Sequence, residues 1–259
     1  ILDKSYRLPQ LIHSKANTLI KRVKDRVEKE WTSREERGEI NIHPVPQLNR
    51  LKNGKWLVLA RDRYHLDRLE EELKIEGVYY ERNDETSINK RIHEAILAWE
   101  DVRRGKSIDI KRVKRIYTYL KTGEGVSKEH KGMKNADKEK LYTFDTLFTH
   151  YGLLIDKDKP WFKALENIEN NKKTYVRMCL RRKENIRQGP RIKLSTIHGS
   201  KGSEADNVML LTDLSRKSDE EYWRQRDSER RVFYVGMTRA RNSLDIVRSQ
   251  TDREFTEAF

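Results

Sequence analysis

The sequence predicts an α/β protein in which a parallel sheet covered by helices is interrupted by a helical insertion. Near the start of the chain, short apolar segments alternate with helical patterns. Only helical patterns follow in the middle, and the short apolar segments return after Gln188-Gly189-Pro190. A β-α-β rhythm is typical of parallel sheets covered by helices. We therefore expect one α/β domain formed by residues 1–83 and 190–259, with residues 84–189 as the insertion.

The first segment, residues 1–83, combines helical and strand patterns. A short apolar run at 55–61 follows an Asn53-Gly54 turn and has the composition of a buried strand. The next helical pattern stops at Gly77, and residues 78–80 predict another strand. The apolar residues that mark the two helices recur at helical spacing: Leu11, Ile12, Ala16, Leu19, Ile20 and Val23 in the first, and Leu66, Leu69 and Leu73 in the second.

The insertion, residues 84–189, contains helical patterns with basic and polar faces and no strand pattern, so we expect a small helical subdomain. A charged loop with glycines, residues 121–140, separates the second pattern from the third. We expect Trp99 and Trp161 to be buried, although exposed rings would fit contact with DNA. The three patterns consist of Ile88, Ile92, Ala95, Ile96 and Trp99; of Ile110, Val113, Tyr117 and Leu120; and of Trp161, Leu165 and Ile168.

The last segment, residues 190–259, again combines short apolar runs with a helical pattern, as residues 1–83 do. Residues 191–197, 207–213 and 243–249 predict three strands, and a long helix at about 218–235 is expected between the last two. These strands would join the same sheet as the first segment.

The composition excludes several classes of protein. Hydrophobic residues make up 35% and charged residues 38% of the chain, which is enough apolar material for a modest core. No apolar run reaches the roughly 18–20 residues of a membrane span, and the first residues lack the layout of a signal peptide. The single cysteine, Cys179, cannot form an intramolecular disulfide, and the seven histidines lack metal-ligand spacing. We expect a cytoplasmic protein without a metal site, and, because the chain does not begin with Met, a piece of a longer polypeptide.

The charge balance favours a polyanionic partner. Lys and Arg number 56 against 42 Asp and Glu, a net charge of +14. Basic side chains that neutralise phosphates release condensed counterions and thereby favour binding to nucleic acid. A basic protein with merely solvated faces is the alternative, since charge alone does not specify a fold.

One polar segment, residues 195–211, carries the first chemical signal. A strand ends at Thr196 and is followed by a loop that contains His198, two glycines, Lys201 and Glu204. Ligands of open α/β sheets bind at the carboxyl ends of strands, so this loop is placed for binding. Its glycines permit close backbone approach to a phosphate, and the carboxylate of Glu204 can accept from a sugar hydroxyl.

A second segment, residues 228–247, carries arginines on a turn. A helix ends in Gly236, and Arg239 and Arg241 follow just before a strand. Arginines in such a position suit the charge that develops on a transferring phosphoryl group. Two alternatives stay open: the adjacent pair 230–231 is solvated, and Arg241 pairs with a surface carboxylate.

Together the two segments resemble motifs V and VI of superfamily 1 helicases of the UvrD/Rep/PcrA type. The start of the chain, SYRLPQ and the helix after it, resembles motif IV, and residues 57–80 are similar to motif IVa. The resemblance covers residues 1–83 and 190–259. The family pattern T-x-H-x-x-K-G-x-E is matched by Thr196, His198, Lys201, Gly202 and Glu204, and E-R-R-x-x-Y-V-G-x-T-R-A by Glu229, Arg230, Arg231, Tyr234, Val235, Gly236, Thr238, Arg239 and Ala240.

The resemblance implies a RecA-like domain 2A, which is P-loop NTPase-like but without the P-loop, and a 2B-like insertion at 84–189. It implies ATP with Mg²⁺ as cofactor and single-stranded DNA and junctions of single- and double-stranded DNA as partners. The implied site residues are Arg7 and Arg239 as arginine fingers; Tyr6 and Glu204 at the nucleoside, with Lys201 and Gly202 shaping the cofactor loop; and Arg61, Thr196 and His198 at the DNA.

The parts that a complete nucleotide motor needs are only half present. Gly105-Lys106-Ser107 has Glu100 where the first glycine of a P-loop belongs, and Asp84-Glu85 follows polar residues instead of an apolar strand. We therefore expect that an N-terminal domain 1A of the same polypeptide supplies the other half of the ATP site, and that this chain alone is inactive.

The preferred hypothesis is the C-terminal motor domain of an ATP-dependent DNA helicase or translocase, bacterial or phage-encoded, acting in DNA repair or replication. The resemblance implies 3′ to 5′ movement. A catalytically inactive DNA- or protein-binding module is the alternative, although the retained Arg7, Glu204 and Arg239 favour an active motor. A nuclease–helicase fusion is a third hypothesis, for which these residues offer no clustered carboxylates at a two-metal spacing.

Overall fold

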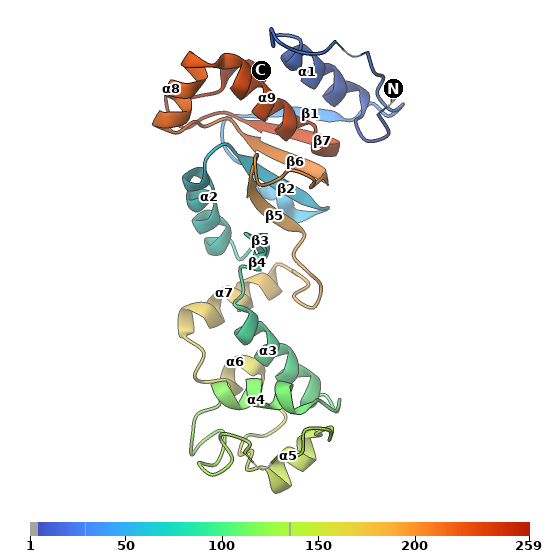
Figure 1. Cartoon of the computed structure of the whole chain (residues 1–259). Helices are drawn as coiled ribbons and strands as arrows, with labels where there is room; N and C mark the ends of the chain where they lie inside the picture. The colour runs from blue at the N-terminus through green and yellow to red at the C-terminus, as the bar shows by residue number, and fades with distance from the viewer. Residues whose placement is uncertain (1–4, 29, 135) are drawn as a thin grey trace. The chain divides into compact units, whose positions relative to one another are not determined.

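The computed structural model of the chain describes residues 5–28, 30–134 and 136–259, so the first four residues of the predicted segment 1–83 lie outside it (Figure 1). The chain forms two compact units. The sheet unit consists of Ile1–Glu76, Tyr80–Asp84 and Pro190–Phe259, and the helical unit of Gly77–Tyr79 and Glu85–Gly189. Each unit is described by itself below.

Within the described residues, a seven-stranded sheet in the order β1-β7-β6-β2-β5-β3-β4 forms the framework of the sheet unit. Five neighbouring pairs along it, from β1 to β3, are parallel. The predicted α/β class with a parallel sheet is therefore confirmed. The strands are β1 (Glu39–His43), β2 (Trp56–Ala60), β3 (Tyr80–Arg82), β4 (Glu85–Thr86), β5 (Ile192–Thr196), β6 (Ala205–Leu211) and β7 (Ala240–Val247).

The central strand β2 explains why helices cover both faces of the sheet. All five of its residues, WLVLA, are buried, and a parallel strand buried on both faces needs a continuous apolar run. It pairs with β6 on one side and β5 on the other. In the register with β5, Ala60 lies opposite Thr196, so both strands end at the same edge.

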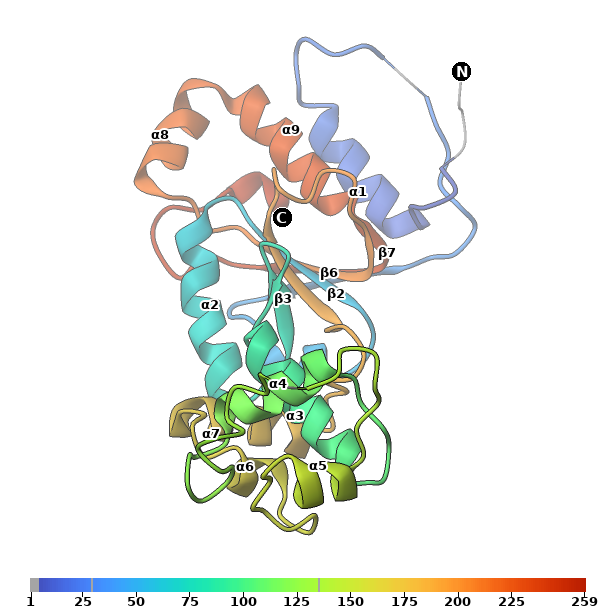
Figure 2. The same cartoon turned by 60° about the horizontal axis from the view of Figure 1, so that its bottom comes forward.

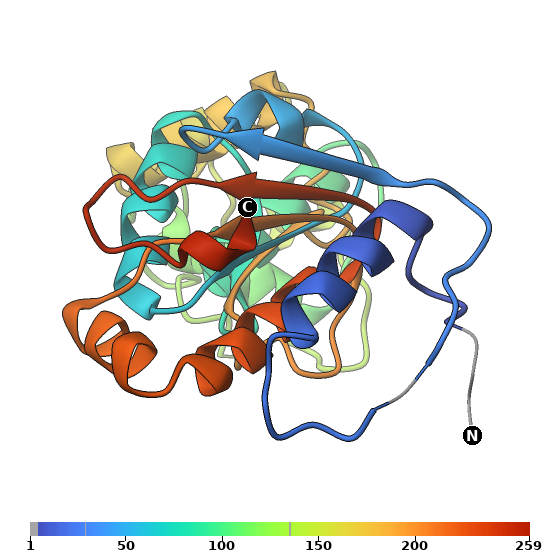
Figure 3. The same cartoon turned by 90° about the horizontal axis from the view of Figure 1, so that it is seen from above.

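In the described part of the sheet unit, α1 (Gln10–Ile20), α2 (Arg63–Ile75) and α9 (Arg226–Met237) pack on the sheet, and α8 (Arg216–Arg224) packs on α9. Helix α1 lies beside α9, as Figure 3 shows, and both contribute to one apolar core with β2, β6 and β7. Helix α2 packs on β2 and β5. The connection from β2 to β3 and that from β6 to β7 travel in opposite directions along the sheet, and right-handed crossovers then place α2 and α9 on opposite faces.

The long helix predicted at about 218–235 is wrong, because two helices occupy this stretch. The chain leaves the helical conformation at Gln225, with φ −136° and ψ 65°, between α8 and α9. Ser215 caps α8 by accepting from the backbone N–H of Ser218. The stretch contains no Gly or Pro before Gly236, so nothing in the sequence marks the break.

Other differences in the sheet unit concern strand positions. The strand predicted at 78–80 is displaced to Tyr80–Arg82, after Gly77 with φ +67° ends the preceding helical stretch. The edge strand β1 was not predicted. The described part of the sheet unit also contains the 3₁₀ helices η1 (Leu48–Lys52) and η2 (Thr256–Ala258).

In its described residues the helical unit has its own apolar core, formed by helices α3 to α7 together with the segments that connect them (Figure 2). Trp99 and Trp161 are buried in it, at 0% and 4% exposed, as predicted. In the loop 121–140, Val126 and Met133 also reach the core. The helices are α3 (Lys90–Val102), α4 (Ile110–Tyr119), α5 (Phe144–His150), α6 (Trp161–Ala164) and α7 (Asn170–Arg181).

The sequence predicted α3 and α4, which pack on each other and begin at the capping residues Asn89 and Asp109. The third predicted pattern forms only the four-residue α6, because the chain turns away at Leu165, and α5 and α7 were not predicted. Within the described residues, the structure contains no helix with the length and apolar character needed to cross a bilayer.

Candidate functional site

Charged residues from distant parts of the sequence meet at the edge of the sheet where β6 and β7 begin. Arg7 lies just before α1, Glu204 directly precedes β6, and Arg239 lies in the turn between α9 and β7. Ala205 of β6 pairs with Ala240 of β7, so the residues before each strand are neighbours. The parallel register of these two strands is therefore what brings Glu204 and Arg239 together.

Glu204 lies between two arginines. Arg241, the second residue of β7, donates to its Oε1, and Nη1 of Arg7 lies 3.7 Å from its Oε2. The hydrogen bond from Arg241, followed by the attraction of Arg7, lowers the pKa of Glu204 below its usual value. About a third of the Glu204 side chain is still exposed. The carboxylate is thus ionised, oriented and accessible.

Arg239 is held by backbone carbonyls. Its Nε donates to the carbonyl of Val235 at 3.2 Å and its Nη1 to the carbonyl of Ser203 at 3.3 Å. Among the described residues its guanidinium forms no ion pair within 4.0 Å. Burial, and then repulsion by Arg7, lower the pKa of Arg239. Two arginines that repel each other this way create a region of positive potential.

Further polar groups lie at this edge, and the side chain of Arg7 is about a third exposed. The Nε of Arg7 is buried and finds no hydrogen-bond partner among the described residues. Burial raises the pKa of Tyr234, while Arg7 and Arg239 oppose the rise, so its hydroxyl lies within the field of both. Tyr6 is 80% exposed, so its ring can meet a ligand. The arginine side chains at this edge outnumber the carboxylates, even though Asp206 also attracts Arg241.

The loop that carries the first polar motif joins two edges of the sheet. Because β5 and β6 both run in the direction of β2, the chain must return from the carboxyl end of β5 to the amino end of β6. Residues 197–204 make this return, so His198 lies near one edge and Glu204 at the other. Between them, Lys201 is exposed. Gly202 has φ +86°, and a Cβ at this position would meet no atom within 4 Å, so the glycine provides a turn instead of a close approach.

Thr196 and His198 lie at the carboxyl end of β5. The Oγ1 of Thr196 accepts from the backbone N–H of Gly199 at 3.0 Å, which fixes the start of the loop. The imidazole of His198 is exposed. These two residues lie beside the end of β2, which is the neighbouring strand, and the family resemblance implies that this surface contacts DNA.

Arg61, at the end of β2, is engaged by carboxylates. Its Nε and Nη2 donate to Glu229 at 2.8 and 2.9 Å, and Nη2 also reaches Glu221 at 3.4 Å. Glu229 is 1% exposed, so this is a buried, bidentate ion pair between β2 and α9. Sequence reasoning did not identify Glu229 as the partner of Arg61, because 168 residues separate them.

Of the alternatives considered for the arginines around motif VI, only the solvation of Arg230 is wrong, since Arg231 is exposed. Arg230 is not solvated, because it donates to Glu257 at 2.9 Å and to Asp227 at 2.8 Å. Arg231 donates to the carbonyl of Asp25. Arg241 does pair with a carboxylate, as considered, but this carboxylate is Glu204 of the site.

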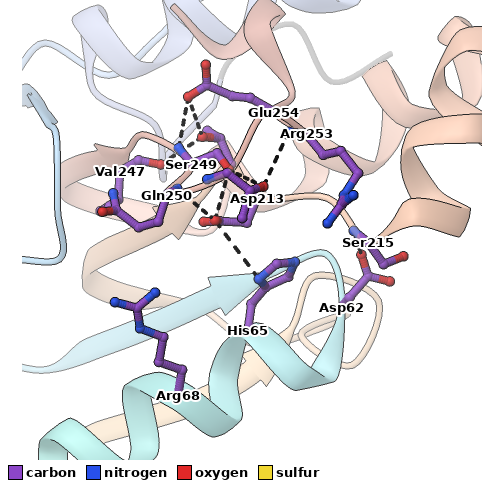
Figure 4. A network of polar contacts seen from close by, with 12 residues as sticks. Asp62, His65, Arg68, Asp213, Ser215, Val247, Ser249, Gln250, Arg253 and Glu254 are labelled. Carbon is purple, nitrogen blue, oxygen red and sulfur yellow. Dashed lines mark hydrogen bonds and ion pairs between the residues drawn. The ribbon is translucent and has the colours of Figure 1, made fainter.

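A network of polar contacts joins the segments that follow the carboxyl ends of β6 and β7 (Figure 4). Asp213 accepts from the hydroxyl of Ser249 and from the backbone N–H of Gln250, each at 3.0 Å, and His65 of α2 lies 4.0 Å away. Asp62 accepts from the backbone N–H of Ser215 at 2.9 Å. These carboxylates are satisfied by the protein itself, in contrast to Glu204.

Comparison with protein families supports the assignment. Residues 76–251 match the family of the UvrD-like helicase C-terminal domain. The chain belongs to this family. A search of curated proteins returned no match. Both polar motif segments fall inside the matched range of the UvrD-like domain, whereas Arg7 and Arg61 precede it. The chain is therefore part of a helicase motor that works on DNA.

Proposed function

We propose that this chain is the second motor domain of an ATP-dependent DNA helicase and that it completes an ATP site with Arg7 and Arg239. One observation carries the proposal: Arg7, Arg239 and Arg241 converge at one edge of the sheet around the carboxylate of Glu204. A triphosphate would supply the negative charge that this edge lacks.

The residues present fit the nucleotide. The Arg7 side chain is about a third exposed, and Arg239 is oriented by backbone carbonyls, so both guanidinium groups are candidate donors to a phosphoryl group. When bound, ATP supplies the phosphoryl group whose developing charge these arginines stabilise. Glu204 would accept from ribose hydroxyls, and the exposed ring of Tyr6 would stack on the base. The Mg²⁺ ligands and the phosphate-binding loop would come from domain 1A of the same polypeptide.

The DNA track would lie at the opposite edge, along the carboxyl ends of β5 and β2. Thr196 and His198 would contact single-stranded DNA there. Arg61 belongs to the same surface, and because its guanidinium is bonded to Glu229, we expect it to shape the track through this pair. The loop 197–204, with Lys201 and Gly202, would couple the nucleotide to the track.

The helical unit would act as the 2B-like part that contacts the duplex at a junction. Residues 85–189 contain 25 Lys and Arg against 15 Asp and Glu, a net charge of +10 of the +14 of the chain. Such an excess favours a phosphate backbone.

The test is ATP turnover by the polypeptide that contains both motor domains, measured with and without single-stranded DNA. We expect turnover that DNA stimulates and that Arg7→Ala abolishes. Arg216→Ala is the matched control, because Arg216 is an exposed arginine paired with Glu220 at 2.9 Å on the first turn of α8. A polypeptide that binds DNA but never hydrolyses ATP would refute the proposal and favour the inactive binding module.

A further inference from the structure

Arg241 lies outside the residues that match the family motifs but contacts the site directly. The motif VI pattern ends at Ala240, and Arg241 is the next residue in β7. Its guanidinium donates to Oε1 of Glu204, and this hydrogen bond is the largest cause of the lowered pKa of Glu204. About half of the Arg241 side chain is exposed, so no requirement of the core explains it.

The backbone that carries Arg241 is fixed on both sides. On one side, β7 pairs with β6 in parallel register, beginning with Ala240 opposite Ala205. On the other, the guanidinium of Arg34 donates to the carbonyl of Arg241 and, at 2.9 Å, to the side chain of Asn242. Arg241 is thus a fixed partner for Glu204, and the carboxylate has a defined position before any ligand binds.

The second partner of Glu204, Arg7, is held more loosely. Its Nη1 lies 3.7 Å from Oε2 of Glu204, beyond ordinary hydrogen-bond distance. Arg7 lies in the segment before α1 and is not part of the sheet. Without Arg241, Arg7 would be the nearest cation to Glu204, and a closer pair between them would occupy the arginine that a phosphate needs.

We propose that Arg241 is a positioning residue of the nucleotide site, which holds the Glu204 carboxylate for the ribose hydroxyls and thereby leaves Arg7 free for the triphosphate. This inference rests on the proposed function. Releasing Arg7 from Glu204 would be required for the bound substrate and the transition state alike, so loss of Arg241 acts on KM more than on kcat.

Arg241→Gln tests the proposal in the polypeptide with both motor domains. We expect KM for ATP to rise about fivefold with kcat changed less than about twofold, and Arg241→Lys to recover most of the loss. The preference for ATP over 2′,3′-dideoxy-ATP, which lacks both hydroxyls, should fall, because Glu204 is no longer oriented. A purely structural role would not change this preference. Arg216→Gln, at another exposed ion pair, should change neither quantity.

Combining the variant with Glu204→Gln gives the decisive comparison. If Arg241 acts through Glu204, Arg241→Gln has no further effect once the carboxylate is gone. An equal loss in both backgrounds would mean direct contact with phosphate and would overturn the inference, as would an unchanged KM in Arg241→Gln. Wild-type protein without any ATP turnover would overturn the proposed function and this inference with it, whereas an active wild type with an unaffected variant overturns the inference alone.

Discussion

Glu204 in the sheet unit and Asp101 in the helical unit are both carboxylates surrounded by cations, but they differ in exposure and in the closeness of their partners. Asp101 is bonded to Arg112 at 2.5 Å, Arg187 at 2.9 Å and Lys106 at 3.3 Å, and its side chain is 8% exposed. Glu204 has one close partner, Arg241, and is 33% exposed.

The difference separates a structural cluster from a candidate binding site. Although burial by itself would raise the pKa of Asp101, hydrogen bonds from Arg112, Arg187 and Lys106 lower it to about 2. That attraction already stabilises the folded state. Around Glu204, by contrast, Arg239 forms no ion pair among the described residues, and the Nε of Arg7 has no partner there. The number of cations near a carboxylate is therefore less informative than the donors that are still free.

Arg239→Ala should have the largest effect and sharpens this comparison. Turnover of ATP should fall about 10³-fold or more, as expected for an arginine finger. The free energy of unfolding should fall by no more than about 2 kcal/mol, because two hydrogen bonds to backbone carbonyls are lost but no ion pair within the described residues. Single-turnover kinetics and urea unfolding measure the two quantities. A large loss of stability with retained ATP turnover would mean that Arg239 stabilises the fold and does not act on the nucleotide.

Glu229→Ala should have the next largest effect, and this effect should be on the free energy of unfolding instead of on ATP turnover. It leaves Arg61 without its bidentate partner while the arginine is 15% exposed, and breaking a buried pair from one side costs about 3 kcal/mol of unfolding free energy. Urea unfolding measures this loss.

The matched control for Glu229→Ala is the double variant Arg61→Met with Glu229→Met, which removes both charges and should recover most of the stability. If Glu229→Ala were as stable as the wild type, the pair would not be the structural contact inferred here.

The parts of the fold that the sequence predicted are those with strong apolar patterns. The buried β2 and the helices α3 and α4 are examples, since each presents several apolar residues at regular spacing. The edge strand β1, with the sequence EINIH, has no fully buried residue and so no such pattern. Helix α7 buries only Val176 and Cys179. Elements with little buried apolar surface depend on their neighbours, which a linear pattern does not contain.

The candidate site was predictable in its residue types but not in its contacts. The motif patterns gave Arg7, Glu204 and Arg239, and the structure brings them to one edge. The bond between Arg241 and Glu204 depends on the register of β6 with β7, and that between Arg61 and Glu229 joins residues 168 positions apart. Such pairs follow from strand order, for which the sequence offers no local signal.

Asp101→Asn tests the structural cluster around Asp101 and should have a smaller effect on the free energy of unfolding than Glu229→Ala. Because the folded pKa of about 2 lies below the usual 3.8, the charged carboxylate contributes about 2 kcal/mol above pH 4. This contribution is lost as the pH falls from about 4 towards 2. Urea unfolding should therefore show wild type and variant differing at pH 7 and converging near pH 2. Asp158→Asn, at an exposed aspartate of the same unit, is the control and should show no difference.

Glu204→Gln should have the smallest effect on stability, less than about 0.5 kcal/mol at pH 7, because an exposed ion pair contributes little to folding. The same variant should raise KM for ATP and weaken the preference for the ribose hydroxyls. Urea unfolding and ATP turnover, measured on one preparation, decide whether the charge of Glu204 serves stability or binding. If Glu204→Gln lost as much stability as Asp101→Asn, both carboxylates would have a structural role. The exposed fraction of a carboxylate would then not distinguish a binding group from a structural one. A small stability change with a raised KM would mean that the charge of Glu204 serves a ligand, since in that case its removal weakens binding while the fold keeps its stability.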